Sequence, residues 1–201
     1  QEQLHPATVE LGLERVGAVA ARLTALPADT RVITVAGTNG KGSCVAVMDA
    51  VLRADGRRVV AYTSPHLHRY NERIRLDGRP VEDAALLEAF AAVDEARGDT
   101  ALTYFEFGTL AALQLAARTA PEVLLLEVGL GGRLDAVNVV DPEVAVVTTI
   151  GLDHQDWLGP DRETIGAEKA GIFRAGVPVV LGEAAPPASV LRRARDLGCP
   201  V

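Results

Sequence analysis

The sequence predicts an α/β protein with a doubly wound, mostly parallel sheet. Two observations predict this class. Apolar runs rich in β-branched residues and leucine alternate along the chain with segments of helical periodicity, as in sheets whose strands are covered on both faces. A glycine-rich turn also follows the first apolar run, and ligands in such sheets bind at the carboxyl ends of the strands.

The apolar runs and the helical patterns define the expected elements in chain order. Asp55 and Gly56 are expected to end the second helix, and Pro121 precedes the third strand. Strands are expected at residues 31–36, 58–62, 122–128, 143–149 and 177–181. Helices are expected at residues 8–25, 41–54, 81–97, 106–119, 161–174 and 187–197.

Composition limits the classes of protein that this chain can represent. With 201 residues, 48% of them hydrophobic, the chain can bury a full core as one domain or one large piece of a longer protein. The formal net charge of −7 argues against nonspecific nucleic-acid binding, because neutralising phosphates requires a basic face. Cys44 and Cys199 have no metal or redox spacing. With neither a signal peptide nor a membrane-length apolar run expected, a cytoplasmic protein without a membrane partner is predicted.

The segment VITVAGTNGKGS at residues 32–43 predicts a phosphate-binding loop. Backbone amides freed by the glycines can converge on an anion, the following helix offers its positive N-terminal end, and Lys41 adds a mobile cation. The Ser43 hydroxyl lies where Mg²⁺ is often held. The residues expected to contact nucleotide are Gly37, Thr38, Asn39, Gly40, Lys41, Gly42 and Ser43.

This loop departs from the general phosphate-loop pattern. That pattern has glycine at the position of Val35 and serine or threonine at that of Gly42. The alternative interpretation is a tight strand-to-helix turn with a surface lysine. Three glycines around a lysine at a helix start favour phosphate binding.

The segment TSPHLHRYNERIRLDG at residues 63–78 predicts a long loop at the edge of the site. It follows a strand without becoming a helix, and long loops within compact domains are often functional. Its arginines, Arg69, Arg73 and Arg75, supply local positive charge that the acidic chain lacks overall. Each arginine can equally be a solvated surface residue.

Glu127 ends the apolar run LLLE just before a glycine-rich segment. A carboxylate buried at a strand end requires a counter-charge. Mg²⁺ shared with Ser43 and phosphate oxygens meets that requirement, because this ion prefers hard oxygen ligands. The alternative is an ion pair with Arg133.

The segment at residues 153–174, DHQDWLGPDRETIGAEKAGIFR, places Asp153, His154 and Asp156 ahead of Lys169. By spacing alone, His154 is more often a structural hydrogen-bonding residue than a metal ligand.

Several segments resemble the folylpolyglutamate and dihydrofolate synthases of the Mur ligase superfamily. The resemblance extends from about Thr8 to Glu183, and the segment at residues 153–174 matches the pattern DHxDWLGxDxxxIxxEKAGIFR of that family. The other matching segments are GKGS at residues 40–43, the SPHL start at residues 64–67, TVELGLERV at residues 8–16 and TYFEFGTLAAL at residues 103–113.

The resemblance implies roles for particular residues, together with ATP and two Mg²⁺ ions as cofactors. Lys169 is commonly carbamylated in that family, and carbamylation converts a cation beside metal ions into an anion. Implied catalytic residues are Lys41, Glu127, His154 and Lys169; implied metal ligands are Ser43, Ser64, Glu127 and His154. Implied substrate contacts are Pro65, His66, Arg73, Phe105 and Glu106. For Phe105 and Glu106, ordinary packing and helix N-terminal charge remain alternatives.

The resemblance also implies an activity. A carboxylate of dihydropteroate or reduced folate attacks the γ-phosphorus of ATP, and the amine of L-glutamate then displaces phosphate from the acyl phosphate to form an amide. A Mur-type peptidoglycan-precursor ligase, a small-molecule kinase and a nonenzymatic nucleotide-binding module remain alternatives. We expect residues 1–201 to be an incomplete ATP-binding domain without the C-terminal domain, acting on small molecules as a monomer, with little turnover alone.

Overall fold

The computed structural model describes residues 12–201. Its strands alternate with helices along most of the chain. The strands are β1 (Arg31–Ala36), β2 (Val59–Tyr62), β3 (Ile74–Leu76), β4 (Arg79–Pro80), β5 (Val123–Glu127), β6 (Val144–Val147) and β7 (Val179–Leu181). The α-helices are α1 (Glu14–Ala20), α2 (Lys41–Ala54), α3 (Asp83–Arg97), α4 (Tyr104–Thr119), α5 (Gln155–Leu158), α6 (Arg162–Lys169) and α7 (Ala188–Asp196). Short 3₁₀ helices cover η1 (Tyr70–Arg73), η2 (Ala136–Val139) and η3 (Ala170–Ile172).

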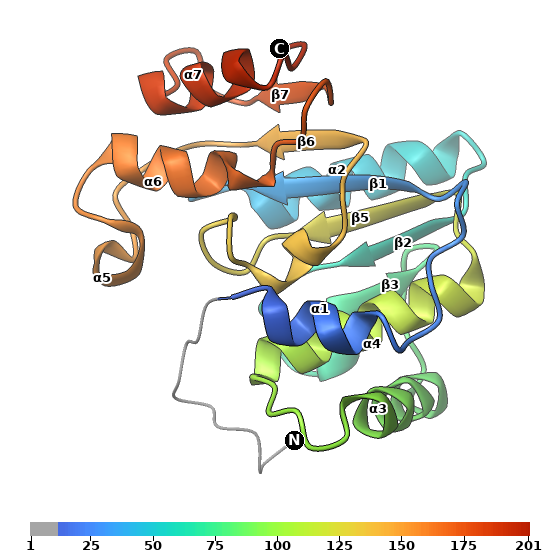
Figure 1. Cartoon of the computed structure of the whole chain (residues 1–201). Coiled ribbons are helices and arrows are strands. Elements are labelled where there is room, and N and C mark those ends of the chain that lie inside the picture. Colours follow the sequence, from blue (N-terminus) through green and yellow to red (C-terminus); the bar gives the residue numbers. More distant parts are fainter. Residues whose placement is uncertain (1–11) are drawn as a thin grey trace.

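Within the described range the strands form one seven-stranded sheet in the order β4-β3-β2-β5-β1-β6-β7. The five strands from β2 to β7 in this order pair in parallel, whereas β3 and β4 run antiparallel at one edge. Helices lie on both faces: Figure 1 shows α1, α4 and α6 in front of the sheet and α2 behind it. The predicted doubly wound, mostly parallel α/β fold is therefore confirmed.

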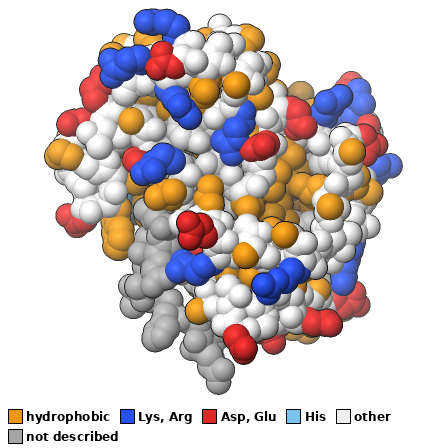
Figure 2. All heavy atoms as spheres, viewed as in Figure 1, with side chains coloured by type: hydrophobic (Ala, Val, Ile, Leu, Met, Phe, Trp, Pro, Cys, Tyr) orange, Lys and Arg blue, Asp and Glu red, His pale blue; other side chains and the backbone are white. Residues whose placement is uncertain are grey.

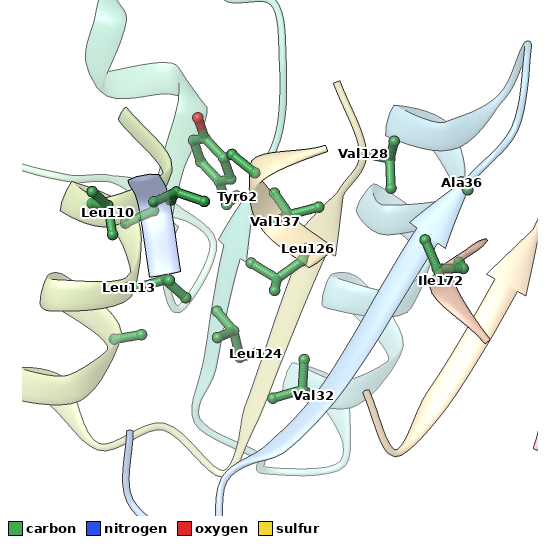
Figure 3. Packing of buried hydrophobic residues seen from close by; sticks show 14 of the residues in the cluster. Val32, Ala36, Tyr62, Leu110, Leu113, Leu124, Leu126, Val128, Val137 and Ile172 are labelled. Atoms are coloured by element: carbon green, nitrogen blue, oxygen red, sulfur yellow. The ribbon is translucent and has the colours of Figure 1, made fainter. Parts of the chain in front are cut away.

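The two faces of the sheet carry cores of different size. On the face of α1 and α4, a large cluster includes Tyr62, Leu124 and Leu126 from the strands and Leu110 from α4 (Figure 3). On the face of α2, a smaller cluster joins Val45 of that helix to Val35 and Leu125 of the strands. Alternate residues along β5 therefore enter opposite cores, as the pleat of a strand requires.

Local sequence signals account for several element boundaries. The Thr103 side chain accepts a hydrogen bond from the Glu106 backbone amide, and the Glu106 carboxylate accepts one from the Thr103 amide, so a capping box starts α4. Between β3 and β4, Asp77 and Gly78 have φ values of 47° and 79°. Asp-Gly is a favoured pair for a two-residue hairpin turn, because both positions require positive φ.

Three expectations about the elements are corrected. The first helix ends at Ala20 rather than at residue 25, because the chain tightens there. The Arg22 and Leu23 amides each donate to a carbonyl oxygen three residues back, as at a helix end that closes with 3₁₀-type bonds. Its expected first residues, 8–11, lie outside the described residues. The segment 63–78 is not a single irregular loop, since it contains η1 and β3. Ile74 is buried there as β3 pairs with β2, and the Asp-Gly signal was available in the sequence.

The expected helix at 161–174 is also shorter, and a small helix precedes it. Regular α6 ends at Lys169 and continues as η3 to Ile172. A Cβ on Gly171 would lie 2.5 Å from the Arg133 Cα, so the chain passes very close to another backbone there. The four-residue helix α5 was not expected. No helix among residues 12–201 is long and apolar enough to cross a membrane.

On the face viewed in Figure 1, acidic and basic side chains are interspersed (Figure 2). The formal charge of −7 is thus not gathered into one patch on this face.

We predict that Leu126→Ala will lower the free energy of unfolding by about 2–5 kcal/mol, because it leaves a cavity in the larger core. Leu126 is 0% exposed, whereas Leu87 on α3 is 65% exposed. Urea unfolding followed by circular dichroism measures the change, with Leu87→Ala as the matched control. Similar small losses in both variants would contradict the assigned core.

Candidate functional site

A cavity lies at the carboxyl ends of β1, β5 and β6. Gly37, Thr38 and Lys41 reach it from the loop after β1, and Gly129 from the loop after β5. The connections leaving β1 and β6 run to opposite sides of the sheet, and ligands in such sheets bind at this kind of switch point. The cavity is completed by Asp153, His154 and Lys169.

The predicted phosphate loop has the backbone geometry of a tight cradle. Gly37 has a φ of 147°, and a Cβ there would lie 1.9 Å from the Thr148 Oγ1. Gly40 has a φ of 81° and is the N-cap of the 14-residue helix α2. Glycine is needed at both positions, and the N-terminal end of α2 favours an anion.

The Lys41 ammonium lies folded against this loop. Its Nζ donates to the Gly37 carbonyl oxygen at 2.9 Å and to the Thr38 carbonyl oxygen at 3.4 Å. The side chain therefore sits beside the helix N-terminus and lines the cavity. Ser43 lies in the first turn of α2 and is exposed.

Glu127 is buried at the end of β5 and is held by two backbone amides. It accepts a hydrogen bond from the Ser64 amide at 3.0 Å and another from the Gly42 amide. Burial raises the pKa of the Glu127 carboxyl, while these hydrogen bonds and the Lys41 charge oppose the shift. The alternative ion pair with Arg133 is not formed, since Arg133 instead contacts the Glu168 carboxylate at 2.9 Å.

A second cavity, of 160 Å³, lies between α2 and the end of β2. Ser64, Pro65 and Glu127 meet here, beside Gly42 and Arg75. The Ser64–Pro65 peptide bond is cis. The structure thus brings two predicted metal ligands, Ser64 and Glu127, to one place directly beside the start of α2.

His154 lies in the first cavity, not in the second. Its Nε2 is 3.8 Å from the Asp153 Oδ2, and its side chain is 58% exposed. The residue has a φ of 48° and precedes α5. It therefore faces the cavity of Lys41 and Lys169 instead of the Ser64–Glu127 pair.

Lys169 is a buried amine in the first cavity. Desolvation, followed by the Lys41 charge, lowers its pKa to about 8, although Asp153 and Asp135 oppose this shift. At pH 7 about one such amine in ten is uncharged, compared with roughly one in three thousand at an ordinary lysine pKa. The Lys169 amine is therefore more nucleophilic at neutral pH than an amine with the ordinary lysine pKa.

Buried Arg73 pairs with the half-buried His66 and has aromatic neighbours. The Arg73 Nε donates to the His66 Nδ1 at 2.8 Å, and the guanidinium lies over the Tyr70 and Tyr104 rings at 5.3 and 5.4 Å. Arg73 is 8% exposed, so it is not a solvated loop arginine. Arg69, in contrast, forms an exposed ion pair with Asp83.

Phe105 and Glu106 have clear roles within the protein. The Phe105 ring lies 6.0 Å from that of Tyr62, and a Cβ on Gly129 would approach it to 2.6 Å. Besides its capping hydrogen bond, buried Glu106 contacts Arg15 at 3.1 Å. Both Glu106 oxygens are thus occupied by protein groups. Of the matching segment at residues 8–16, residues 8–11 lie outside the described range.

Comparison with known proteins decides the family. The Mur ligase middle domain family matches residues 35–181, which is more than half of the chain. The chain belongs to the Mur ligase family.

This Mur ligase chain is similar to enzymes that act in folate metabolism. It is 54% identical over 197 residues to the dihydrofolate synthase/folylpolyglutamate synthase of Escherichia coli (strain K12), and the match covers 98% of this chain and 47% of that protein. It superposes on E. coli FolC in complex with DHPP and ADP with a TM-score of 0.93 and 52% identity, covering 99% of this chain and 48% of that chain.

A third similar protein was solved with a metal ion bound. The structure of the bifunctional folylpolyglutamate synthase/dihydrofolate synthase from Yersinia pestis, complexed with AMPPNP and Mn ion, has a TM-score of 0.91 and 53% identity. The match covers 99% of this chain and 48% of that chain. The Mur ligase chain thus spans about half the length of the relatives it matches. The expected resemblance to folate ligases is confirmed.

One residue of the Mur ligase site was missed from the sequence. Asp135 is buried after the glycine-rich segment that follows β5, where its carboxylate accepts hydrogen bonds from the Leu130 amide at 2.8 Å and the Val137 amide at 3.0 Å. Burial raises its pKa to about 6, against the opposing effect of these amides. Asp135 thereby shapes the loop that lines the first cavity. The signal available in the sequence was a single acidic residue that follows the glycine-rich segment.

The shift at Asp135 predicts an unusual pH dependence. The folded-state pKa of about 6 lies above the ordinary 3.8, so this carboxyl contributes stability below about pH 4 that is lost as pH rises through 6. The free energy of unfolding of wild type minus that of Asp135→Asn should fall by roughly 2 kcal/mol between pH 4 and 6, because the folded-state carboxyl is only half titrated at pH 6. Denaturant unfolding across this range measures it.

The control for this measurement is Asp55→Asn, because the Asp55 side chain is 69% exposed. A difference curve for Asp135→Asn that rises or stays flat would contradict the assignment.

Proposed function

We propose that the chain forms the nucleotide-binding part of an ATP-dependent ligase that joins L-glutamate to dihydropteroate, to reduced folate, or to both. The observation that carries the proposal is the phosphate loop at the switch point, with Lys41 folded beside the N-terminus of α2. The similarity to dihydrofolate synthase/folylpolyglutamate synthase supports the choice of substrates, a pteroate or folate carboxylic acid and the amine of L-glutamate. The expected reaction proceeds through an acyl phosphate and leaves ADP, phosphate and the amide.

The loop supports binding of the ATP phosphates. The positive N-terminal end of α2 favours negative charge, and the Lys41 ammonium can reach a phosphate once it releases its two hydrogen bonds to carbonyl oxygens. As charge accumulates on the transferred phosphoryl oxygens, these donors stabilise it without reorganisation of solvent. Thr38 and Asn39 lie in the same loop.

The donor set beside α2 fits Mg²⁺. Glu127, Ser43 and Ser64 offer hard oxygen atoms, and Mg²⁺ is commonly held by one or two carboxylates together with phosphate oxygens. Among residues 12–201, no three side chains of His, Cys, Asp or Glu gather as a metal cluster. Bound Mg²⁺ would neutralise phosphate charge. We propose two ions, one near Ser43 and one near Ser64 and Glu127, with His154 reaching the second by movement of its exposed loop.

The folate acid is proposed to bind next to the second cavity. Pro65 lines that cavity, and His66 follows it with its Nδ1 occupied by Arg73. His66 therefore presents Nε2 to a ligand, while Arg73 acts from behind it. Phe105 offers an apolar face beside Gly129. Glu106 supports this wall through α4 and Arg15 rather than by a free oxygen.

Lys169 is proposed to be carbamylated. Its neutral amine nitrogen attacks the carbon of CO₂, an N–C bond forms and one proton is released. The product is an anion that faces Lys41, so two cations in one cavity become an opposite-charge pair. A carbamate would also supply oxygen atoms to the metal site.

The remaining parts of the proposal concern the whole protein. Because the chain spans about half of its relatives, ligase activity is proposed for the intact protein and not for residues 1–201 alone. We further propose a cytoplasmic monomer that binds small molecules and neither nucleic acid nor membrane.

We predict that Lys41→Ala and Glu127→Gln in the intact protein will each lower glutamate-dependent phosphate release by about 10²-fold or more, because each removes a preorganised charge. Phosphate release with ATP, dihydropteroate and L-glutamate measures the effect. Glu122→Gln is the control, since Glu122 pairs with Arg57 on the surface. Unchanged rates in both variants would refute the proposal, and a stable phosphoester product would indicate a kinase instead.

We predict that the intact protein in bicarbonate at neutral pH will carry the mass of one added carboxyl group on Lys169. Native mass spectrometry measures it, and mild acid should remove the adduct. Lys169→Met should lack it, whereas Glu122→Gln, altered on the surface, should retain it. An adduct located on Lys41, or none on Lys169 in crystals loaded with nucleotide and metal, would contradict carbamylation.

A further inference from the structure

The phosphate loop is joined to the loop after β6 by threonine hydroxyls. The Thr38 Oγ1 accepts a hydrogen bond from the Gly151 amide at 3.0 Å and donates to the Gly151 carbonyl oxygen at 3.2 Å. The Thr38 amide also donates to the Thr149 carbonyl oxygen at 2.7 Å. Pairing between β1 and β6 therefore continues beyond the ends of both strands.

A second set of contacts fixes Asn39. Its carbonyl oxygen accepts hydrogen bonds from the Thr148 Oγ1 at 2.6 Å and the Thr149 Oγ1 at 3.3 Å. In a trans peptide the carbonyl and the next amide point in opposite directions. The Gly40 amide is thus directed away from Thr148 and Thr149. We call Thr38, Thr148 and Thr149 the threonine clamp.

The clamped loop carries the residues that face the cavity. Beyond Gly151 it contains Asp153 and His154, and it is anchored again where buried Leu158 approaches Gly131. Between these anchors lie exposed Leu152 and Trp157, at 61% and 51% exposure. A Cβ on Gly151 would contact Thr38 at an ordinary 3.6 Å. The hydroxyl of Thr38 thus holds the start of this loop, together with the Arg162 Nε, which donates to the Ile150 carbonyl oxygen at 2.8 Å.

We propose that Thr38 is a positioning residue that couples occupancy of the phosphate loop to the placement of Asp153 and His154. A nucleotide that orders the loop around Lys41 acts on Gly151 through Thr38, because the two are hydrogen-bonded in both directions. Thr38 thus contributes to ligation by placing the loop after β6 and not chiefly by contacting nucleotide. The inference rests on the proposed function.

The test uses the intact protein with ADP and Mg²⁺. Trp157 is the only tryptophan in the sequence given and lies in the clamped loop, so its fluorescence emission reports the state of that loop. The Trp157→Phe variant supplies the background fluorescence. The variants are Thr38→Val, which removes both hydrogen bonds at nearly constant volume, and Thr38→Ser, which retains the hydroxyl. Thr164→Val is the matched control, because within residues 12–201 that hydroxyl donates to Asp161 at the start of α6 and does not bond to the phosphate loop.

In wild type, ADP and Mg²⁺ should change the Trp157 emission. In Thr38→Val this change should fall by at least about half and kcat for ligation by about 10–100-fold, while the Kd for ADP changes less than about threefold. Thr38→Ser should restore both, and Thr164→Val should resemble wild type. If Thr38→Val does not fold, Thr38→Ala removes the same hydroxyl and carries the test.

Two results would overturn the coupling. One is a large increase in the Kd for ADP in Thr38→Val with a normal emission change at saturation, which indicates a nucleotide contact alone. The other is an emission change and a kcat equal to those of Thr164→Val, which indicates a structural role alone. Failure of the proposed function is distinct, since wild type would then neither bind ADP nor release phosphate in a glutamate-dependent reaction.

Discussion

The site depends on one buried carboxylate that ties three elements together. Glu127 ends the central strand β5 and pairs in register with Val35 of β1. Its carboxylate oxygens accept hydrogen bonds from the backbone amides of Gly42 in α2 and of Ser64 after β2. Removing a charged acceptor from such a place would leave buried amides without partners. The relative position of the phosphate loop, the SPHL segment and the central strand is therefore set by a side chain that is also suited to bind a cation.

Much of the fold could be predicted from the sequence because its signals are local. The apolar runs predicted the five parallel strands, and helix α2 was predicted with the observed bounds. The antiparallel edge was missed because β3 and β4 are only three and two residues long, too short for alternation to appear. Their Asp-Gly turn was the stronger signal.

The sequence predicted which residues belong to the candidate site but not how they are arranged in space. The sequence indicated Lys41, Ser64, Glu127 and Lys169 by motif, yet only the folded chain separates His154 from the Ser64–Glu127 pair. Asp135 and the threonine clamp were missed for a shared reason: their roles consist of hydrogen bonds to backbone groups distant in sequence, and single acids or hydroxyls carry no periodic pattern. Their contribution appears only when strands from different parts of the chain meet.

The uneven cores have a consequence for how the molecule responds to its ligand. Helix α2, whose N-terminus forms the phosphate loop, is held to the sheet by the smaller cluster, and its outward Val47 and Val51 are each 63% exposed. Regions with few buried apolar contacts open at lower free energy than the rest of a protein. A nucleotide that binds only the closed form stabilises it by mass action. If the chain binds nucleotide as proposed, the helix layer with the smaller buried cluster is thus the one that nucleotide binding would stabilise most directly.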